Sequence, residues 1–389
     1  MQSGGPTAVI NRSLVGIIRE ASDSSEIKSI YGAVHGLDGL LTAKFLDLGN
    51  QSNEILERVS ITPAAALGSS RRRLRDGDLE SVLGQLKRLD VGYCFIIGGN
   101  DSAETSSRLG KAADVTGMQL KVICVPKTID NDLVETDHTP GYGSAAQFVA
   151  YATMGAGRDA EAMGNTAPIT VIEVMGRDSG WLAAAASLGK RDECDAPHTL
   201  GLPEIPMDED RFLTLMENAY HAYGFAVAVV AENTRGPRGV LGNELVPERV
   251  DDFGHPYFRG AGNYLAQQLR NRLRLQVRYE HPGTIQRSMA TCISHNDAVE
   301  AEMVGREAVR YALDGYTGQM VALIRDSEHP YRCSVGLAPL ERIVGRVKTM
   351  PENYLDPKNY STTAAFSAYA QPLVNPLPHF GRLDTHVGR

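Results

Sequence analysis

Short apolar runs alternate with longer amphipathic segments through the first 300 residues of the chain. Four runs, residues 91–97, 121–125, 169–174 and 226–231, have the length and the Val, Ile, Ala and Phe content of buried strands. Apolar residues recur with helical spacing in the segments 54–60, 79–89, 144–155, 208–223, 258–274 and 296–314. This alternation predicts an α/β fold in which mostly parallel sheets are covered by helices on both faces.

Polar or glycine-containing residues follow each predicted strand. The turns after the first three strands are residues 98–101, 126–128 and 175–177, and the fourth strand leads directly into Glu232. Because ligands of open α/β sheets collect at the carboxyl ends of the strands, we expect these residues to lie around one site.

The two ends of the chain differ from its middle. Gly4-Gly5-Pro6-Thr7 has the character of a phosphate-binding loop that leads into a helix, expected over 11–21. Such a loop normally follows a strand of about 5–6 residues. Only three residues precede it here, so we expect the first strand to be missing from this sequence. From about residue 350 onward, prolines interrupt the pattern, and we expect this last segment to pack on the body without a catalytic role.

Composition narrows the class of protein. With 389 residues the chain is long enough for two domains. A net charge of -8 argues against a nucleic-acid partner, which requires a positive surface. No apolar stretch approaches the ~20 residues of a membrane helix, and the start lacks the pattern of a signal peptide. The five cysteines are scattered, without the paired spacing of a zinc site. We therefore expect a cytoplasmic protein with reduced thiols and no membrane partner.

The most informative segment is residues 126–132, directly after the second predicted strand. Asp130 and Asp132 flank an amide, and Lys127 lies three positions before the first acid. Phosphoryl transfer needs a base near the attacking hydroxyl, cations around the transferring group and a carboxylate that holds a metal ion. This segment contains all three types of residue. An Asx-rich turn with solvated acids is the alternative, and the position at a strand end favours a site.

Two further turns have the chemistry of phosphate sites. The glycines at 98–99 let the backbone approach a phosphate beside the free N–H groups of a helix N-terminus. Asn100 and Asp101 add oxygen ligands that suit hydrated Mg²⁺. Arg71, in the arginine-rich turn 68–73, is either part of a solvated basic loop or a clamp on the phosphates of a donor. We favour the clamp.

Arginines also follow the later strands. Arg177 stands where a guanidinium can hold a phosphate in bidentate fashion or stabilise transition-state charge, although alone it would be interpreted as a surface charge. Glu232 can accept hydrogen bonds from sugar hydroxyls. Arg278 and Arg287 form a pair of the kind that holds a phosphomonoester.

Together these motifs resemble the phosphofructokinase family over residues 3–345. The motifs that carry the resemblance, in the family's order and spacing, are Gly4-Gly5-Pro6 with Asn11, the turn at 68–71, residues 98–102, 126–132 and 175–177, and Gln286-Arg287. The resemblance implies two similar three-layer α/β domains with the active site in the cleft between them. It implies a donor-binding domain of residues 1–140 plus about 288–330, a sugar-phosphate-binding domain of residues 141–287, and a C-terminal extension of residues 331–389.

The resemblance also implies an activity, the reversible transfer of a phosphoryl group to the C1 hydroxyl of fructose 6-phosphate with Mg²⁺ as cofactor, in glycolysis or gluconeogenesis. By position, Asp130 resembles the base that takes the hydroxyl proton, and Thr128, Asp132 and Arg177 resemble the other catalytic residues. The residues similar to the family's sugar-phosphate contacts are Thr128, Asp130, Asp132, Met175, Gly176, Arg177, Glu232, Arg278 and Arg287. Those similar to its donor contacts are Gly5, Arg71, Gly99, Asp101 and Lys127, with Asn100 and Asp101 near the metal. Arg278 resembles an arginine that reaches in from a neighbouring subunit, which implies a homodimer or homotetramer with a shared active site.

Two positions bear on the donor. Members that use ATP have glycine where Asp101 and Lys127 stand, and this chain resembles the pyrophosphate-dependent members. A carboxylate at Asp101 would repel the α-phosphate of ATP, while Lys127 brings charge to a short donor that has no adenosine. The departures from the family pattern are Asn100 in place of an aspartate, Thr284 in place of a histidine or tyrosine, and Pro168 in place of a second cross-subunit arginine. An ATP-dependent enzyme and a non-catalytic regulatory subunit are the alternatives. A nucleotide-binding oxidoreductase would need a Gly-x-Gly-x-x-Gly turn after a strand, which this sequence lacks.

Overall fold

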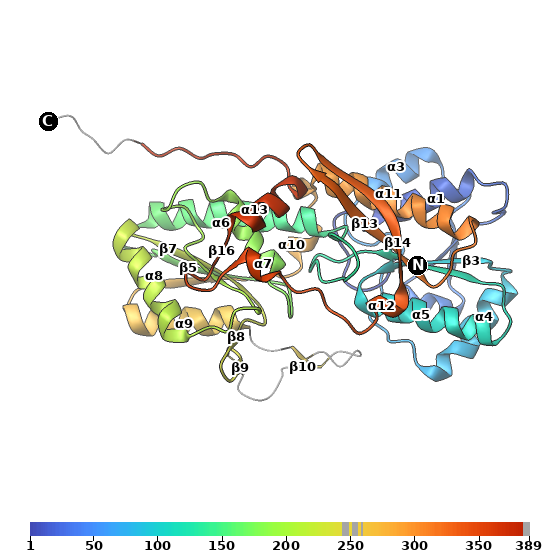
Figure 1. Cartoon of the computed structure of the whole chain (residues 1–389), viewed down its shortest axis with the longest axis horizontal. Helices are drawn as coiled ribbons and strands as arrows, with labels where there is room; N and C mark the ends of the chain where they lie inside the picture. Colours follow the sequence, from blue (N-terminus) through green and yellow to red (C-terminus); the bar gives the residue numbers. More distant parts are fainter. Residues whose placement is uncertain (243–248, 251–255, 258–259, 384–389) are drawn as a thin grey trace.

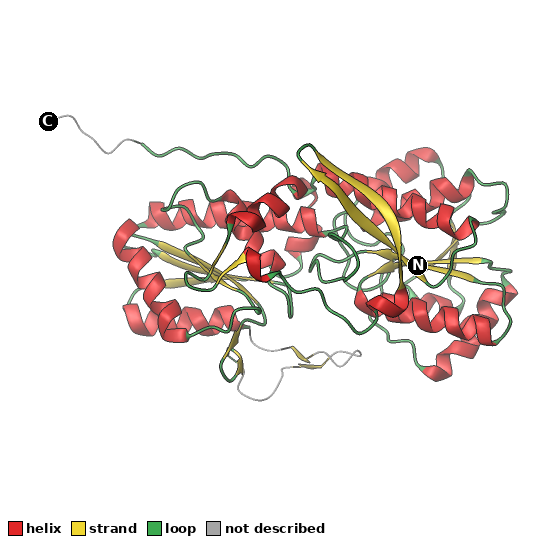
Figure 2. Ribbon diagram, in the orientation of Figure 1, coloured by secondary structure: helices red, strands yellow, loops and turns green. Residues whose placement is uncertain are grey.

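The computed structural model describes residues 1–242, 249–250, 256–257 and 260–383. The chain forms two four-stranded sheets at opposite ends of an elongated molecule, each covered by helices on both faces (Figure 1, Figure 2). The predicted α/β fold is therefore confirmed.

The first sheet is mixed. It has the order β14-β13-β4-β3 and contains β3 (Tyr93–Gly98), β4 (Lys121–Pro126), β13 (Gln319–Glu328) and β14 (Tyr331–Pro339). Strands β3, β4 and β13 run parallel to one another, and β14 runs antiparallel to β13. The register pairs Gly98 with Pro126, so the two turns that follow β3 and β4 begin side by side.

The second sheet is entirely parallel. It has the order β12-β5-β7-β6 and contains β12 (Val277–Glu280), β5 (Ile169–Val174), β7 (Ala226–Ala231) and β6 (Thr199–Gly201). Every residue of β5 and of β7 is buried, as expected for parallel strands covered on both faces. Because β5 and β7 end level with each other, the turns that follow them also begin side by side.

Helices and short strands complete the fold. The α-helices are α1 (Ile10–Ser22), α2 (Leu37–Thr42), α3 (Asn53–Ile61), α4 (Asp76–Arg88), α5 (Asn100–Val115), α6 (Tyr142–Met163), α7 (Trp181–Ala185), α8 (Glu209–Tyr223), α9 (Ala261–Leu273), α10 (Ile285–Ser288), α11 (His295–Leu313), α12 (Leu340–Ile343) and α13 (Ala364–Ala370). The 3-10 helices are η1 (Ala186–Gly189), η2 (Ala290–Cys292), η3 (Glu352–Tyr354) and η4 (Gln371–Leu373). Two-stranded hairpins are formed by β1 (Tyr31–Ala33) with β2 (Phe45–Asp47), β8 (Arg235–Gly236) with β9 (Gly239–Val240), β10 (Arg249–Val250) with β11 (Pro256–Tyr257), and β15 (Leu355–Asp356) with β16 (Ser361–Thr362). Of the predicted helix 258–274, residues 258–259 lie outside the described residues.

Helix α6 is longer than the predicted segment 144–155 because buried residues continue at helical spacing as far as Ala160. Its first turn is held from α11. Asp297, which is buried, accepts hydrogen bonds from the backbone N–H of Gly141 at 2.7 Å and of Ser144 at 2.9 Å. The carboxylate satisfies two of the free N–H groups at the helix start, and it fixes the chain directly after residues 126–139.

A buried charged cluster supports that same stretch of chain. The two ring nitrogens of His138 face Asp137 Oδ2 at 2.8 Å and Glu300 Oε2 at 2.7 Å. Arg325 donates to Asp137 Oδ2, and the Tyr331 hydroxyl donates to Glu300. Burial alone would lower the pKa of His138, but the two carboxylates outweigh burial and raise it to about 9. We call these five residues the His138 cluster, whose imidazole is protonated at neutral pH.

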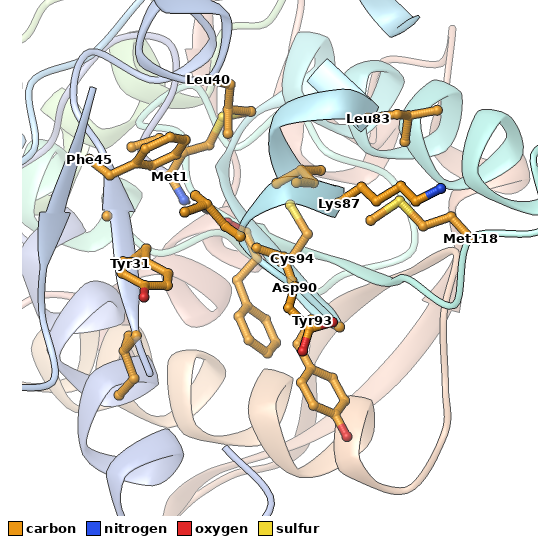
Figure 3. Close-up of a pocket in the computed structure, with 18 of the residues that line it drawn as sticks. Met1, Tyr31, Leu40, Phe45, Leu83, Lys87, Asp90, Tyr93, Cys94 and Met118 are labelled. Atoms are coloured by element: carbon orange, nitrogen blue, oxygen red, sulfur yellow. Dashed lines mark hydrogen bonds between the residues drawn. The ribbon is translucent and has the colours of Figure 1, made fainter. Parts of the chain in front are cut away.

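The start of the chain runs beside β3. The Met1 amino group donates to the carbonyl oxygen of Phe95 at 2.7 Å, and the Ser3 N–H donates to that of Ile97 at 2.9 Å. A cavity of about 1610 Å³ lies between this segment, the β1–β2 hairpin and α4 (Figure 3). Its lining is largely apolar and contains neither acid of the 126–132 turn. The predicted absence of a preceding strand stays a prediction.

The C-terminal part of the chain connects the two halves. After α12 it runs from the first sheet's half to the second (Figure 1), where Tyr369 of α13 contacts Trp181 of α7 with 5.3 Å between the ring centroids. Phe366, Tyr369 and Leu373 belong to the same hydrophobic core as β5 and β7. Among the described residues, no helix combines the length and the apolar character needed to cross a membrane. The predicted domain boundaries also stay predictions.

Candidate active site

The acid turn, residues 127–132, begins where β4 ends. The Asp130 N–H donates to Thr128 Oγ1 at 3.1 Å, and the Thr128 carbonyl oxygen accepts from Thr139 Oγ1 at 2.9 Å. Asn131 has φ of 53° and is fully buried. This left-handed conformation suits asparagine better than most residues, and it turns the chain sharply between Asp130 and Asp132.

The two acids of the turn have unusual electrostatics. Burial raises the pKa of Asp130, and nearby Glu232 raises it further against the opposing charge of Arg177. Burial and the neighbouring charge of Asp130 raise the pKa of Asp132. A carboxylate with a raised pKa is a stronger base, as a proton acceptor working near neutral pH requires.

The second sheet's half supplies the opposite side of this site. The Ser179 hydroxyl donates to the Asp130 carbonyl oxygen at 3.1 Å, so the turn after β5 contacts the acid turn directly. The Arg177 N–H donates to Glu232 Oε1 at 3.2 Å, and the Met175 N–H donates to Gln286 Oε1 at 3.1 Å. The structure therefore brings the turns after β4, β5 and β7 together, as the sequence predicted.

Backbone geometry limits the residues allowed in this turn. Gly176 has φ of 143°, and a Cβ atom there would lie 2.6 Å from the carbonyl oxygen of Ser179. Only glycine fits both conditions.

Cations gather at the N-terminal loop. Lys127 is 2% exposed, and its Nζ donates to the carbonyl oxygens of Ser3 at 2.8 Å and Gly5 at 2.7 Å. A Cβ atom on Gly5 would lie 2.7 Å from Nη1 of Arg287, so the guanidinium rests against this loop. Burial and the charges of Arg287 and Arg71 lower the pKa of Lys127 to about 7. Arg71, Arg287 and the protonated form of Lys127, held this close together, favour a multiply charged anion.

The start of α5 supplies oxygen ligands. Asn100 Nδ2 donates to Asp132 Oδ2 at 2.8 Å. The remaining oxygens, Asn100 Oδ1 and Asp132 Oδ1, are buried and have no hydrogen-bond partner among the described residues. Buried oxygens in this state suit a hard divalent cation. Gly99 caps the helix, and Asp101 lies in its first turn. In the described part of the chain no group of three or more His, Cys, Asp or Glu side chains is arranged to hold a metal ion, so phosphate oxygens and water would complete such a coordination shell.

Arg278 lies apart from this group. It pairs with Thr170 near the start of β5, whereas Met175 follows the end of that strand. A separation of five residues corresponds to about 16 Å along a strand. The Arg278 side chain forms an ion pair with Asp159 of α6. Within its own chain, therefore, Arg278 does not reach the acid turn.

Sequence reasoning missed two residues that contact the acid turn. Lys348 and Tyr369 come from the C-terminal segment, the part of the chain that follows α12; from about residue 350 onward this segment was expected to have no role in catalysis. Their side chains hydrogen-bond Asn131. Neither residue stands in a recognisable motif, and the turn lies more than 200 positions away in the chain, so no local signal could have found them.

Comparisons with known proteins agree with this geometry. The phosphofructokinase family model matches residues 1–312. The pyrophosphate–fructose 6-phosphate 1-phosphotransferase of Rhodospirillum rubrum is 37% identical over 96% of this chain and 93% of its own. An ATP-dependent 6-phosphofructokinase of Streptomyces coelicolor is 30% identical over 92% of this chain and 97% of its own.

A solved structure extends the likeness to the fold. The pyrophosphate-dependent phosphofructokinase of Nitrosospira multiformis superposes with a TM-score of 0.88 at 32% identity, covering 99% of this chain and 93% of that one. The chain belongs to the phosphofructokinase family.

Proposed function

We propose that this protein transfers a phosphoryl group from pyrophosphate to the C1 hydroxyl of fructose 6-phosphate, giving fructose 1,6-bisphosphate and phosphate. The observation that carries the proposal is the position of Asp130. This half-buried acid contacts the turn of Arg177 through its carbonyl oxygen, and Lys127 and Arg287 lie close enough to act on its charge. The relatives named above as pyrophosphate-dependent support the same activity.

The chemistry assigns one task to each side of the site. Asp130 accepts the proton of the C1 hydroxyl, whose oxygen forms a bond to the nearer phosphorus atom of the donor. The bridging P–O bond breaks, and its electron pair leaves with phosphate. Arg177, Lys127 and Arg71 neutralise the charge on the transferring and leaving groups, because phosphoryl transfer depends mainly on positioning and electrostatic stabilisation. Both reaction directions use the same groups, so the reaction serves glycolysis or gluconeogenesis.

Sugar binding is assigned to the second sheet's half. Met175 and Gly176, in the turn after β5, and Glu232, directly after β7, contact the sugar. Arg287 provides a cation for the 6-phosphate. Arg278 does not reach this place within its own chain, which supports its proposed role in the site of a neighbouring subunit. We therefore propose a homodimer or homotetramer with shared active sites, located in the cytoplasm.

Donor choice is assigned to Asp101 and Lys127. Lys127 fixes the N-terminal loop through two carbonyl oxygens, which leaves one of its three N–H groups for a donor phosphate. Glycine at this position would remove both functions. A carboxylate at Asp101, in the first turn of α5, disfavours the α-phosphate of a nucleotide.

We propose that a divalent cation, Mg²⁺, binds between the start of α5 and the acid turn. Asn100 Oδ1 and Asp132 Oδ1 would hold it, either directly or through water, with Asp101 close by. Bound there, the cation would neutralise charge on the phosphate oxygens of the donor.

Phosphorus NMR tests the reaction directly. Fructose 6-phosphate, Mg²⁺ and pyrophosphate are incubated with the protein, and the products are followed with time. We expect a new phosphomonoester on C1 and free phosphate in a one-to-one ratio, with pyrophosphate reappearing when the products are supplied instead. Consumption of pyrophosphate without a sugar bisphosphate would contradict the proposal. Turnover with ATP alone would favour the type found in the Streptomyces coelicolor relative.

A further inference from the structure

The C-terminal segment lies directly behind the acid turn. After α12 the chain crosses between the two halves (Figure 1), and the Lys348 N–H donates to the carbonyl oxygen of Asp132 at 2.8 Å on the way. The carbonyl oxygen of Lys348 accepts from Trp181 Nε1, on the other half, at 3.2 Å. This residue is therefore attached by its backbone to both sides of the proposed site.

The Lys348 side chain points into the same turn. Its Nζ donates to Asn131 Oδ1 at 3.2 Å, to the Thr136 carbonyl oxygen at 3.3 Å and to the Asp137 carbonyl oxygen at 2.8 Å. Burial lowers the pKa of Lys348 to about 7, and in its protonated form the side chain has three N–H donors, all of which these acceptors use. The ammonium also lies 5.1 Å from the centre of the Trp181 ring, within the range of a cation–π contact.

Asn131 is held from its other side as well. Its Nδ2 donates to the Tyr369 hydroxyl at 2.9 Å, and that hydroxyl donates to the Asp137 carbonyl oxygen at 2.8 Å. The amide of Asn131 is thus fixed through its oxygen by Lys348 and through its nitrogen by Tyr369. Both partners come from the C-terminal segment. Asn131 has a left-handed backbone and stands between the two acids of the turn.

We propose that Lys348 is a positioning residue of the transfer reaction, which holds Asn131 and thereby orients the carboxyl groups of Asp130 and Asp132; this role rests on the proposed function of those acids. Tyr369 acts on the same amide from the opposite side. Neither side chain is assigned a contact with substrate. Misplacement of a reacting group by about 1 Å can reduce the rate by about 10²-fold, so the loss of these contacts is expected to appear in kcat.

The variant Lys348→Met tests the proposal, because it keeps the apolar stem beside Trp181 and removes the ammonium. We expect kcat to fall by about 10- to 10²-fold, while KM for fructose 6-phosphate and for pyrophosphate changes by less than threefold. Lys348→Arg, which restores a positive donor, should recover part of kcat. Lys358→Met, on the same segment but exposed, is the matched control and should behave like the wild type.

A second variant separates positioning from general stability. Tyr369→Phe removes only the hydroxyl, and the double variant with Lys348→Met should lose less in kcat than the product of the two single losses, because both act through one amide. All rates are expressed per folded protein, measured by circular dichroism. Unchanged kcat in Lys348→Met, or a loss that disappears on this correction, overturns the proposal. If Lys348→Met does not fold, Tyr369→Phe decides the question: a kcat within twofold of the wild-type value would also overturn the proposal.

Wild-type turnover in the same assay keeps the two claims distinct. A wild-type protein without turnover on pyrophosphate would contradict the proposed function itself. Wild-type turnover together with an unaffected Lys348→Met variant would contradict only the role of Lys348.

Discussion

Replacing Lys127 by methionine is the most quantitative test of the donor site. The side chain is 2% exposed and makes hydrogen bonds of 2.8 and 2.7 Å to the carbonyl oxygens of Ser3 and Gly5. Hydrogen bonds to a charged group contribute about 1.5–3 kcal/mol each. Because the loop can regain part of this by exposing its carbonyl groups to water, we take about 3 kcal/mol for both. With 1.4 kcal/mol for each factor of ten, kcat/KM for pyrophosphate should fall by about 10²-fold.

The assay is steady-state turnover with fructose 6-phosphate saturating and pyrophosphate varied. Lys121→Met is the matched control, because Lys121 begins the same strand, β4, at the end away from the loop. We expect this control to keep the wild-type kcat/KM. A loss below threefold in Lys127→Met would refute the reasoning, since it would mean that neither the loop contacts nor the charge supports donor binding.

The remaining predictions concern the base, the N-terminal loop and the charged cluster. Asp130→Asn should lower kcat by at least about 10²-fold with little change in KM, measured in the same assay. Gly5→Ala should weaken pyrophosphate binding, because the added methyl group would meet Arg287; calorimetry measures this. The raised pKa of His138, about 9 against an ordinary 6.5, means that its stabilisation is complete below pH 6.5 and is lost as pH rises through about 9. His138→Gln should therefore lower the unfolding free energy by on the order of 2–3 kcal/mol at pH 6 and by much less at pH 10, in urea titrations.

Each of these three predictions would be contradicted by a specific result. An Asp130→Asn enzyme with more than a tenth of the wild-type kcat would exclude the base assignment. Pyrophosphate affinity unchanged in Gly5→Ala would mean that the loop and Arg287 are free to separate. If His138→Gln were equally destabilised at pH 6 and pH 10, the ion pairs of the cluster would not be the source of its stability.

The parts of the fold that follow local rules could be predicted from sequence. The strands β4, β5 and β7 are continuous apolar runs because both of their faces are buried, and their turns meet because parallel strands end at one edge of a sheet. The β13–β14 hairpin was not predicted. An apolar run, residues 320–324, does begin β13, but the outer positions of the hairpin alternate between exposed and half-buried, so most of its length has no apolar pattern.

The site likewise contains residues that the sequence could predict and residues that it could not. Asp130, Asp132 and Arg177 stand in short motifs whose chemistry can be read directly. Lys348 and Tyr369 contact the acid turn only because the C-terminal segment crosses between the two halves. The path of this segment depends on tertiary packing. From its prolines we had expected a segment without a catalytic role. A lysine whose role is to hold a backbone turn has no spacing or neighbouring residue that distinguishes it from a surface lysine.

The central claim is that the donor is pyrophosphate. The most direct measurement compares kcat/KM for pyrophosphate and for ATP in parallel, with fructose 6-phosphate and Mg²⁺ held at the same saturating concentrations. We predict a value for pyrophosphate that exceeds that for ATP by at least about 10²-fold, since a misplaced like charge against the α-phosphate costs several kcal/mol. Equal values, or a preference for ATP, would contradict the assignment of Asp101 and Lys127.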